Sequence, residues 1–274
     1  MPNQPFISLG QAALNYRGIR AAPNGDIYAC VGAGSIWKQT SGSGPFIDLN
    51  QTTRNWAGIA VAPNGDVYAC VSGSGVGDIY KMNGAGVFVS LNQALLNYAG
   101  ICVAPNGDLY ACVNQNSIYI MAGGTGDLVN LNQTSRFWSG MGAAPNGDVF
   151  ATCVGANANI YKRTGGAGDF VTIGQPSRNY SGITAMANGD IYACVNMGSI
   201  WKQTGGAGNF VDLNQTARGW IGIGAAPNSD VYACVTTAGT GNIYKQLKVS
   251  PPNNTGGGGS GIDFNFGIGF GLGI

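Results

Sequence analysis

The chain is organised around one short stretch that recurs six times. Its first copy, residues 22–31, reads Ala-Pro-Asn-Gly-Asp-Ile-Tyr-Ala-Cys-Val. The aspartates of the copies are Asp26, Asp66, Asp108, Asp148, Asp190 and Asp230. Successive copies are therefore alternately 40 and 42 residues apart. A fixed period of this size indicates a repeat architecture, in which each copy builds one structural unit.

Each unit has four short apolar segments separated by turn signals. In the second unit they are residues 45–49, 57–63, 66–71 and 78–82, and none is long enough for a helix. The Asn64-Gly65 pair between the middle two is a strong hairpin signal, because both residue types accept a positive φ. Four strands in about 40 residues, repeated six times, predict an all-β fold: a six-bladed β-propeller of four-stranded blades.

The two ends of the repeat region are expected to meet. Residues 6–9, at the start of the chain, match the outermost strand of the other units. The last unit has only its first three strands and ends near residue 245. The amino-terminal strand is therefore predicted to complete the sixth blade, which would remove open sheet edges. The predicted division is a propeller at 1–248, a flexible Pro/Gly-rich linker at 249–261 and an apolar strand at 262–274.

Composition excludes much chemistry. Of 274 residues only 9% are charged, and the chain has neither His nor Glu. Ser-His-Asp and Cys-His catalysis are thus impossible, and the net charge of +1 does not favour nucleic acid. The Asp after each turn is expected to cap its own backbone, so no metal and no cofactor are predicted. The seven cysteines, with no C-x-x-C spacing, are expected to be small buried residues.

The repeat resembles a known family. The run from Gly58-Ile59-Ala60-Val61 through Asp66-Val67-Tyr68-Ala69, followed by Asp78-Ile79-Tyr80-Lys81, is similar to the NHL-type propeller repeat. The resemblance covers residues 5–248 and implies the fold. The family's Asp after the second strand is Val here, so its RNA-binding and ubiquitin-ligase associations are not carried over. A weaker resemblance is to uncharacterised bacteriophage propeller-repeat proteins.

A second period pairs the units. Odd units span 40 residues and carry a Tyr before the innermost strand, at Tyr16, Tyr98 and Tyr180. Even units carry a Trp there, at Trp56, Trp138 and Trp220. The units therefore form three pairs with pseudo-threefold symmetry. This pairing fits either duplication history or a place on a threefold axis of an assembly.

The same loops supply candidate ligand-binding residues. Each carries a Gln, and four carry an Arg two residues before the aromatic: Arg54, Arg136, Arg178 and Arg218. Aromatic faces with guanidinium and amide donors suit a saccharide. The candidates are these four arginines with Trp56, Trp138, Trp220, Tyr16, Tyr98 and Tyr180. The alternative is structural, with the aromatics packed between blades and the Gln residues tying adjacent loops.

The carboxy-terminal segment has a strict period of two. Its apolar residues are Ile262, Phe264, Phe266, Ile268, Phe270, Leu272 and Ile274. Exposed, they would promote aggregation, so the segment is expected to anchor the protein in a partner by adding a strand to a sheet edge. Folding back onto the propeller is the alternative.

These observations predict a non-enzymatic structural or binding protein. With no signal peptide and no membrane span, it would be a virion-surface spike, decoration or receptor-binding protein that contacts a host glycan or receptor. The alternatives are a lectin with sites between blades and a propeller hydrolase with a metal in its channel, as in gluconolactonase-like propellers.

Overall fold

The computed structural model describes residues 4–156, 158–236 and 241–246, and within them every element is a β-strand or a short 3-10 turn. The amino-terminal strand is β1 (Ile7–Ser8). The first repeat unit contains β2 (Tyr16–Ala21), β3 (Ile27–Gly34), β4 (Ile36–Gln39), η1 (Thr40–Gly42) and β5 (Ile47–Asp48). The second contains β6 (Arg54–Val61), β7 (Val67–Val71), β8 (Ile79–Met82) and β9 (Phe88–Ser90). The third contains β10 (Tyr98–Val103), β11 (Leu109–Val113), β12 (Ile118–Met121), η2 (Ala122–Gly124) and β13 (Val129–Asn130).

The later units repeat this order. The fourth contains β14 (Trp138–Ala143), β15 (Val149–Cys153), β16 (Ile160–Arg163), η3 (Thr164–Gly166) and β17 (Val171–Thr172). The fifth contains β18 (Tyr180–Ala185), β19 (Ile191–Gly198), β20 (Ile200–Gln203), η4 (Thr204–Gly206) and β21 (Val211–Asp212). The last contains β22 (Arg218–Ala225), β23 (Val231–Val235) and β24 (Ile243–Gln246).

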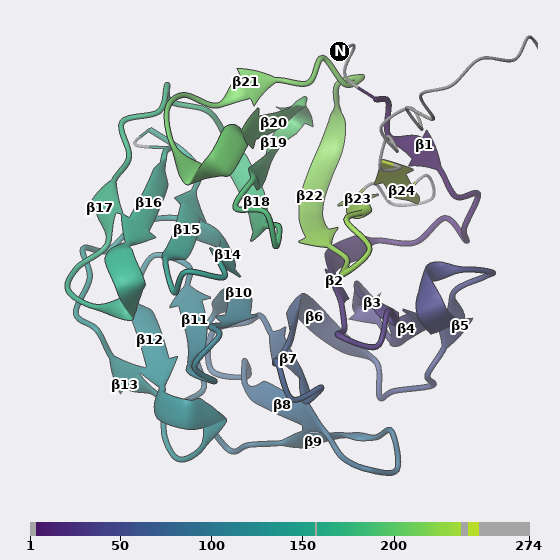
Figure 1. Ribbon diagram of the computed structural model, residues 1–274. Helices are drawn as coiled ribbons and strands as arrows, with labels where there is room; N and C mark the ends of the chain where they lie inside the picture. The colour runs from purple at the N-terminus through teal and green to yellow at the C-terminus, as the bar shows by residue number, and fades with distance from the viewer. Residues whose placement is uncertain (1–3, 157, 237–240, 247–274) are drawn as a thin grey trace, which may run out of the picture.

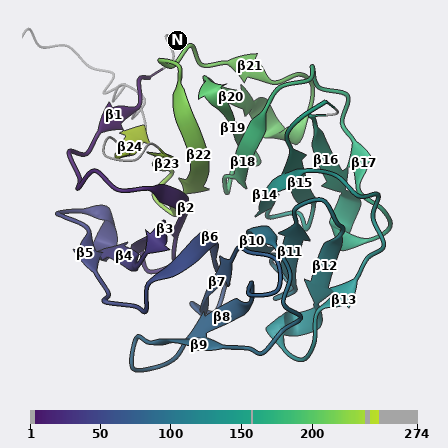
Figure 2. The same ribbon diagram turned by 180° about the vertical axis from the view of Figure 1, so that it is seen from behind.

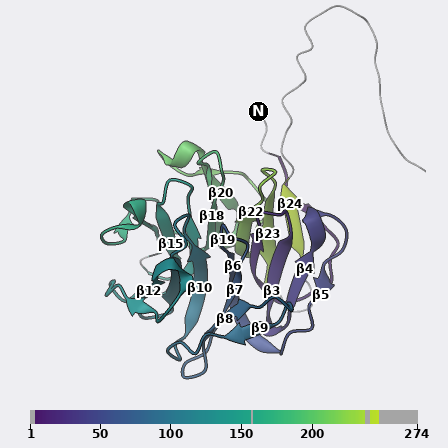
Figure 3. The same ribbon diagram turned by 60° about the horizontal axis from the view of Figure 1, so that its bottom comes forward.

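The strands of each unit form an antiparallel sheet in chain order, as in β10-β11-β12-β13. The sheets are arranged around a common centre, with the first strand of each unit innermost (Figure 1). Seen after rotation, β6, β10, β18 and β22 lie toward the middle while β5 and β12 lie at the periphery (Figure 3). The strand β1 lies beside β24 in both face views (Figures 1 and 2), with Ile7 opposite Lys245.

The core lies between neighbouring sheets. One hydrophobic cluster combines Tyr110 and Cys112 of the third unit with Trp138 and Met141 of the fourth. Strands in the middle of each sheet bury both faces, and all five residues of β7 are buried. This double burial explains why the repeats contain so few charged residues.

The units are joined in pairs. Strand β3 extends to pair with β6, and β19 pairs with β22 in the same way. Between the third and fourth units an isolated bridge joins Asn116 to Arg136. Each of these links runs from an odd unit to the following even one. The extended β3–β6 and β19–β22 pairings thus follow the two-unit period of the sequence, while a further isolated bridge joins Asn15 to Thr236 of the last unit.

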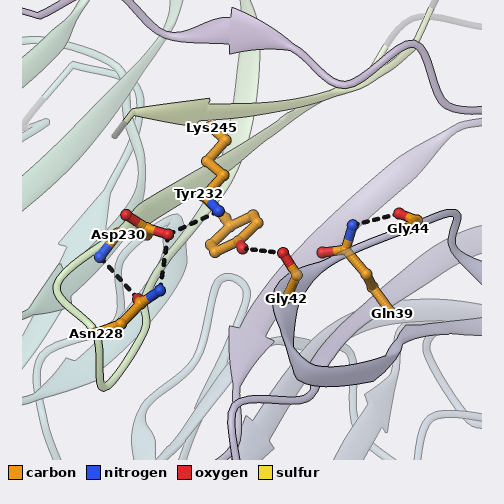
Figure 4. Close-up of polar contacts among 7 residues, drawn as sticks. All are labelled: Gln39, Gly42, Gly44, Asn228, Asp230, Tyr232 and Lys245. Atoms are coloured by element: carbon orange, nitrogen blue, oxygen red, sulfur yellow. Dashed lines mark hydrogen bonds and ion pairs between the residues drawn. The ribbon is translucent and has the colours of Figure 1, made fainter. Parts of the chain in front are cut away.

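The recurring turn, Asn-Gly-Asp in five units and Asn-Ser-Asp in the last, is a polar cluster. In the last unit Asp230 accepts a hydrogen bond from the Nδ2 atom of Asn228 at 2.8 Å, and its Oδ2 lies 2.7 Å from Lys245 Nζ (Figure 4). The Tyr232 hydroxyl beside them donates to the carbonyl of Gly42 in the first unit at 3.2 Å. The prediction that the Asp caps its own backbone is corrected, because the Asn does so: the Asp230 amide donates to Asn228 Oδ1. The carboxylate of Asp26 instead accepts from the Ser41 amide, beyond the third strand.

Five of the six turn aspartates pair with a lysine on the third strand of their unit. The third unit differs, because Ile120 lies where the others have Lys, opposite Tyr110. Burial raises the pKa of Asp26, but hydrogen bonds from Lys38, the Ser41 amide and Asn24 outweigh it, so that the net pKa is lowered. The pKa of Asp190 is lowered in the same way, by Lys202, the Gly205 amide and Asn188.

We expect Asp26→Asn to lower the free energy of unfolding at neutral pH by about 1–2 kcal/mol, because it removes a charged partner from Lys38. A carboxyl whose folded pKa lies below its unfolded value of about 3.9 stabilises the fold above that value. The contribution is lost as the pH falls through the folded pKa, so Asp26→Asn should flatten the acid limb of the stability curve. Urea titrations between about pH 2 and pH 7 measure this. Asp108→Asn, in the unit without the lysine, is the matched control; an equal loss in both variants would contradict the ion-pair explanation.

No helix in the described part of the chain is long and apolar enough to cross a bilayer. The seven residues predicted to anchor a partner, from Ile262 to Ile274, lie outside the described residues, as does most of the proposed linker. Their anchoring role stays a prediction.

Candidate functional site

A narrow channel lies between the six innermost strands. Each of these strands carries a glycine followed by Ile or Met, and the glycines are Gly18, Gly58, Gly100, Gly140, Gly182 and Gly222. A Cβ atom on Gly18 would lie 3.2 Å from the Cα atom of Gly58, and one on Gly140 would lie 3.0 Å from that of Gly182. Glycine thus lets neighbouring innermost strands approach closely, and the cavity left between them is only about 40 Å³.

Each innermost strand also has a β-bulge at its start. In β2 the register shifts between Tyr16 and Gly18, so that Arg17 is the extra residue. The same shift occurs in the equivalent strands of the other units. Side chains three residues apart normally point to opposite faces, but one extra residue brings them to the same side. This is why Arg17 and Arg20 both line the channel.

Arg20 lies inside the channel. Its Nη1 atom donates to the carbonyl of Ile223 at 2.7 Å, and Nη2 donates to those of Met141 and Ile183. These carbonyls belong to the fourth, fifth and last units, so one side chain links sheets on opposite sides of the centre. Burial lowers the pKa of Arg20, although a guanidinium keeps its charge at neutral pH.

The positions equivalent to Arg20 differ between odd and even units. They are Arg20, Ala60, Cys102, Gly142, Thr184 and Gly224. Odd units therefore contribute the larger, polar side chains and even units the small ones. Cys102 is buried there, and burial raises the pKa of its thiol to about 12.

The channel widens at one end into a depression of about 250 Å³, here called the mouth. Its polar lining residues are Arg17, Asn55, Ser72, Asn97, Asn114 and Ser139. No carboxylate is among the described residues that line the channel or this mouth.

Arg17 is positioned by its own sheet. Its side chain lies against Gly32, where a Cβ atom would be 2.9 Å from Arg17 Nε. This Nε atom is buried and has no hydrogen-bond partner among the described residues. The mouth thus carries the positive charge of Arg17, while its Nε atom is covered by the sheet.

The predicted aromatic residues are buried. The three tryptophans are each 1% exposed and the three tyrosines 0%. Trp56 packs edge-on against Tyr80 with ring centroids 5.1 Å apart, and it also contacts Phe88. The hydroxyl of Tyr16 donates to the carbonyl of Ala12. These rings present no exposed face on which a sugar could stack.

The four predicted arginines lie on aromatic rings. The Cζ atoms of Arg54, Arg136 and Arg218 are 4.7, 4.6 and 4.9 Å from the ring centroids of Tyr80, Tyr161 and Tyr244. Arg178 lies 3.9 Å over Trp201. Each Arg lies over an aromatic ring of its own unit, and the ten candidate residues are not gathered into one site. That they bind a ligand stays a prediction, while their contacts follow the structural alternative.

The glutamines of the same loops tie neighbouring units together. Gln51 Oε1 accepts from the amide of Phe88 at 2.9 Å, and Gln215 Oε1 accepts from that of Phe6 at 2.8 Å. Corresponding bonds are made by Gln11, Gln93, Gln133 and Gln175. Five of them join the loop before an innermost strand to the outer strand about 36 residues further along the chain, and Gln215 joins its loop to the amino-terminal Phe6. These contacts follow the structural alternative.

The cysteines behave as predicted. All seven are buried. Cys30 Sγ would lie 3.2 Å from a Cβ on Gly18, so the thiols fill the space behind the glycines of the channel. Within the described residues no three His, Cys, Asp or Glu side chains are grouped so that they could hold a metal.

Sequence reasoning missed Arg17 and Arg20. The available signal was a departure from the repeat, because the positions equivalent to Arg17 hold only Ala, Ser or Ile. A cation within an apolar strand next to a glycine is unexpected. Only the arrangement of the innermost strands around a common centre makes both arginines neighbours of one channel.

Comparison with known proteins identifies the fold. Neither a protein-family model nor a curated protein matches the sequence. Among solved structures the chain resembles a gluconolactonase from Xanthomonas campestris, with a TM-score of 0.73, 13% identity and 89% of each chain covered. It also resembles virginiamycin B lyase from Staphylococcus aureus, with a TM-score of 0.61, 15% identity and 89% and 88% covered. A third similar structure is the aldose sugar dehydrogenase from Streptomyces coelicolor, with a TM-score of 0.63, 15% identity, and 89% of this chain and 98% of that chain covered. The chain is a β-propeller repeat protein.

These structures correct the functional expectation. The sequence predicted a non-enzymatic protein of a virion surface or a lectin. That prediction rested on the lack of His and Glu, on the apolar segment 262–274 and on the resemblance of the repeat to bacteriophage proteins. That prediction is wrong, because the propellers that share this architecture are a gluconolactonase, a lyase and a sugar dehydrogenase. The error has a physical reason. Missing residue types exclude particular mechanisms, whereas a guanidinium in a confined channel is itself able to stabilise a reacting anion.

Proposed function

We propose that this propeller is an enzyme that acts on a small ester or lactone at the mouth of its central channel. The observation that carries the proposal is the pair of guanidinium groups, Arg17 and Arg20, in a channel whose described lining has no carboxylate. Such a site attracts an oxyanion. A gluconolactonase among the similar structures supports the choice of a cyclic ester.

In this reaction the main role of the side chains is to supply positive charge. A water oxygen adds to the carbonyl carbon, and the negative charge that develops on the carbonyl oxygen is stabilised by the positive charge of the Arg17 guanidinium at the mouth. The ester C–O bond then breaks, the water proton passes to the leaving alcohol oxygen, and the acid product loses its proton to solvent. Arg20, deeper in the channel, adds positive potential. The amides of Asn55, Asn97 and Asn114 provide donors and acceptors for substrate hydroxyls.

A divalent metal does not fit this mouth. Hard cations are usually held by carboxylates together with neutral oxygens. The described lining offers amide and hydroxyl oxygens but no carboxylate, and the Arg17 guanidinium repels a cation. We therefore derive no metal-assisted step.

The test is hydrolysis of a panel of lactones and p-nitrophenyl esters, followed by proton release or absorbance. We expect turnover by the wild type, and a loss of kcat/KM of about 100-fold or more in Arg17→Gln, the effect of removing one oxyanion donor. Lys202→Gln removes the same charge at the turn of the fifth unit and should retain activity. A folded Arg17→Gln protein with unchanged kcat/KM, or a wild type inactive on every substrate, would overturn the proposal.

We also propose that the units form six blades and that β1 closes the sixth. The pairing of β1 with β24 supports this, as do the bond from Gln246 Nε2 to the Gln4 carbonyl and the contact of Phe6 with Trp220 at 6.0 Å between ring centroids. The Gly-Ile and Asp-Val-Tyr pattern supports an NHL-like origin of the repeat. Anchoring of residues 262–274 in a protein partner remains a proposal supported by their period of two.

A further inference from the structure

A second pocket lies between the third and fourth units. It occupies about 180 Å³ and is lined by Gln115, Arg136, Phe137, Cys153 and Val154, among others. These residues come from the β11–β12 turn, the segment before β14 and the end of β15. No carboxylate is among its described lining residues.

Phe137 departs from the repeat. Four of the six units have an asparagine at this position: Asn15, Asn55, Asn97 and Asn179. Those amides tie loops together. Asn97 Oδ1 accepts from the Gly73 amide at 3.0 Å, and Asn55 Nδ2 donates to Ser72 Oγ at 2.7 Å.

The replacement has a structural cost. Phe137 cannot make the loop hydrogen bond, and it leaves 48% of its side chain exposed. Among the exposed large apolar residues of the described chain, Phe137 is the only aromatic one. A ring face in a pocket is suited to stacking against a flat ligand.

The pocket also holds a cation in a fixed place. The backbone of Arg136 is held by the Gln115 amide, which donates to its carbonyl at 2.9 Å, and by the bridge to Asn116. Its guanidinium rests on Tyr161, at 4.6 Å from the ring centroid. Trp138 Nε1 donates to the Asn116 carbonyl and so holds the segment before β14 against the β11–β12 turn. Arg136 and Phe137 therefore line the same pocket, and no carboxylate is among its described lining residues.

We propose that this pocket binds a single planar ring that carries a carboxylate, with the ring against Phe137 and the carboxylate on Arg136. The apolar Cys153 and Val154 line the other side. Pockets for drug-sized ligands are about 300–1,000 Å³, so a cavity of about 180 Å³ admits a molecule of benzoate size. The site is separate from Arg17 and does not depend on the proposed hydrolysis.

The experiment is calorimetric titration of the full chain with sodium benzoate, sodium acetate and benzyl alcohol. We expect saturable benzoate binding in the submillimolar to millimolar range, as ligands of this size allow. Acetate and benzyl alcohol, which lack the ring or the charge, should each bind at least about 10-fold more weakly, equivalent to about 1.4 kcal/mol.

Phe137→Asn is the decisive variant because it restores the residue that the other units use, so folding should be retained. It should weaken benzoate binding about 10-fold, as loss of one aromatic stacking contact implies. Arg136→Gln should abolish the preference for benzoate over benzyl alcohol. No saturable benzoate binding to the wild type, or equal affinity in Phe137→Asn, would overturn the proposal. Proton-detected saturation-transfer measurements on the same variants would reveal the bound ring directly.

Discussion

Replacing Gly140 by alanine is expected to lower the free energy of unfolding by about 3 kcal/mol, at the upper end of the usual cost of overpacking. The added Cβ would lie 2.7 Å from the Ser181 carbonyl oxygen and 3.0 Å from both Gly182 Cα and Thr152 Oγ1. Two of these three atoms are backbone and cannot rotate away. Relief requires the innermost strands β14 and β18 to separate, which would disturb contacts on both sides of the channel.

The matched control is Gly84→Ala. Gly84 lies in the exposed turn between β8 and β9, and a Cβ there would meet nothing within 4 Å. Its effect should stay within about 0.5 kcal/mol, as for other surface substitutions. Urea unfolding followed by circular dichroism compares the two. Equal stability of both variants would mean that the innermost strands adjust freely and that the glycines do not set the channel width.

Replacing Trp56 by alanine is expected to destabilise the protein by about 4 kcal/mol, within the range for deleting a large buried aromatic side chain. The ring is 1% exposed and packs against Tyr80 and Phe88. It belongs to a cluster that also contains Tyr28 and Ile36 of the preceding unit. Its loss would therefore weaken the contact between two sheets.

Trp56→Phe separates packing from hydrogen bonding. Trp56 Nε1 has no hydrogen-bond partner among the described residues, unlike Trp138 Nε1, which donates to Asn116. The Phe variant should therefore lose only part of the ring, about 1–2 kcal/mol. Thermal and urea unfolding measure both variants. If Trp56→Ala kept full stability and lost binding to a glycan array, the residue would be a ligand contact instead of a packing one.

Much of the fold was predictable because it is local and repeated. The Asn-Gly turn accepts a positive φ, and Gly25 and Gly65 have φ values of 87° and 90°. The alternation of small and large apolar residues predicts strands buried on both faces, as Val67–Val71 are. The buried role of Cys30 and the other thiols followed from their fixed position in the repeat. Such features depend on neighbours within about ten residues, so one copy is enough to recognise them.

The functional expectation failed because it rested on which residue types are missing. The absence of His and Glu excludes some mechanisms but says nothing about where the remaining cations lie. Arg17 and Arg20 looked like two of thirteen cations in the chain. Their significance depends on the bulge in β2 and on carbonyls more than 100 residues away, such as those of Met141 and Ile223.

The sequence alone therefore determined the repeat, its strands and turns, and the pairing of odd with even units, because backbone propensity and side-chain period are local properties. Only the tertiary structure decided which aromatic rings are buried, which arginines share a channel free of carboxylates in its described lining, and why Phe137 lies beside Arg136 in a pocket between two units. These features arise where strands distant in the sequence come together, and burial and charge are properties of that arrangement. The recurrent Asp-containing turn builds the scaffold, while the residues that break the repeat mark the places where it can act.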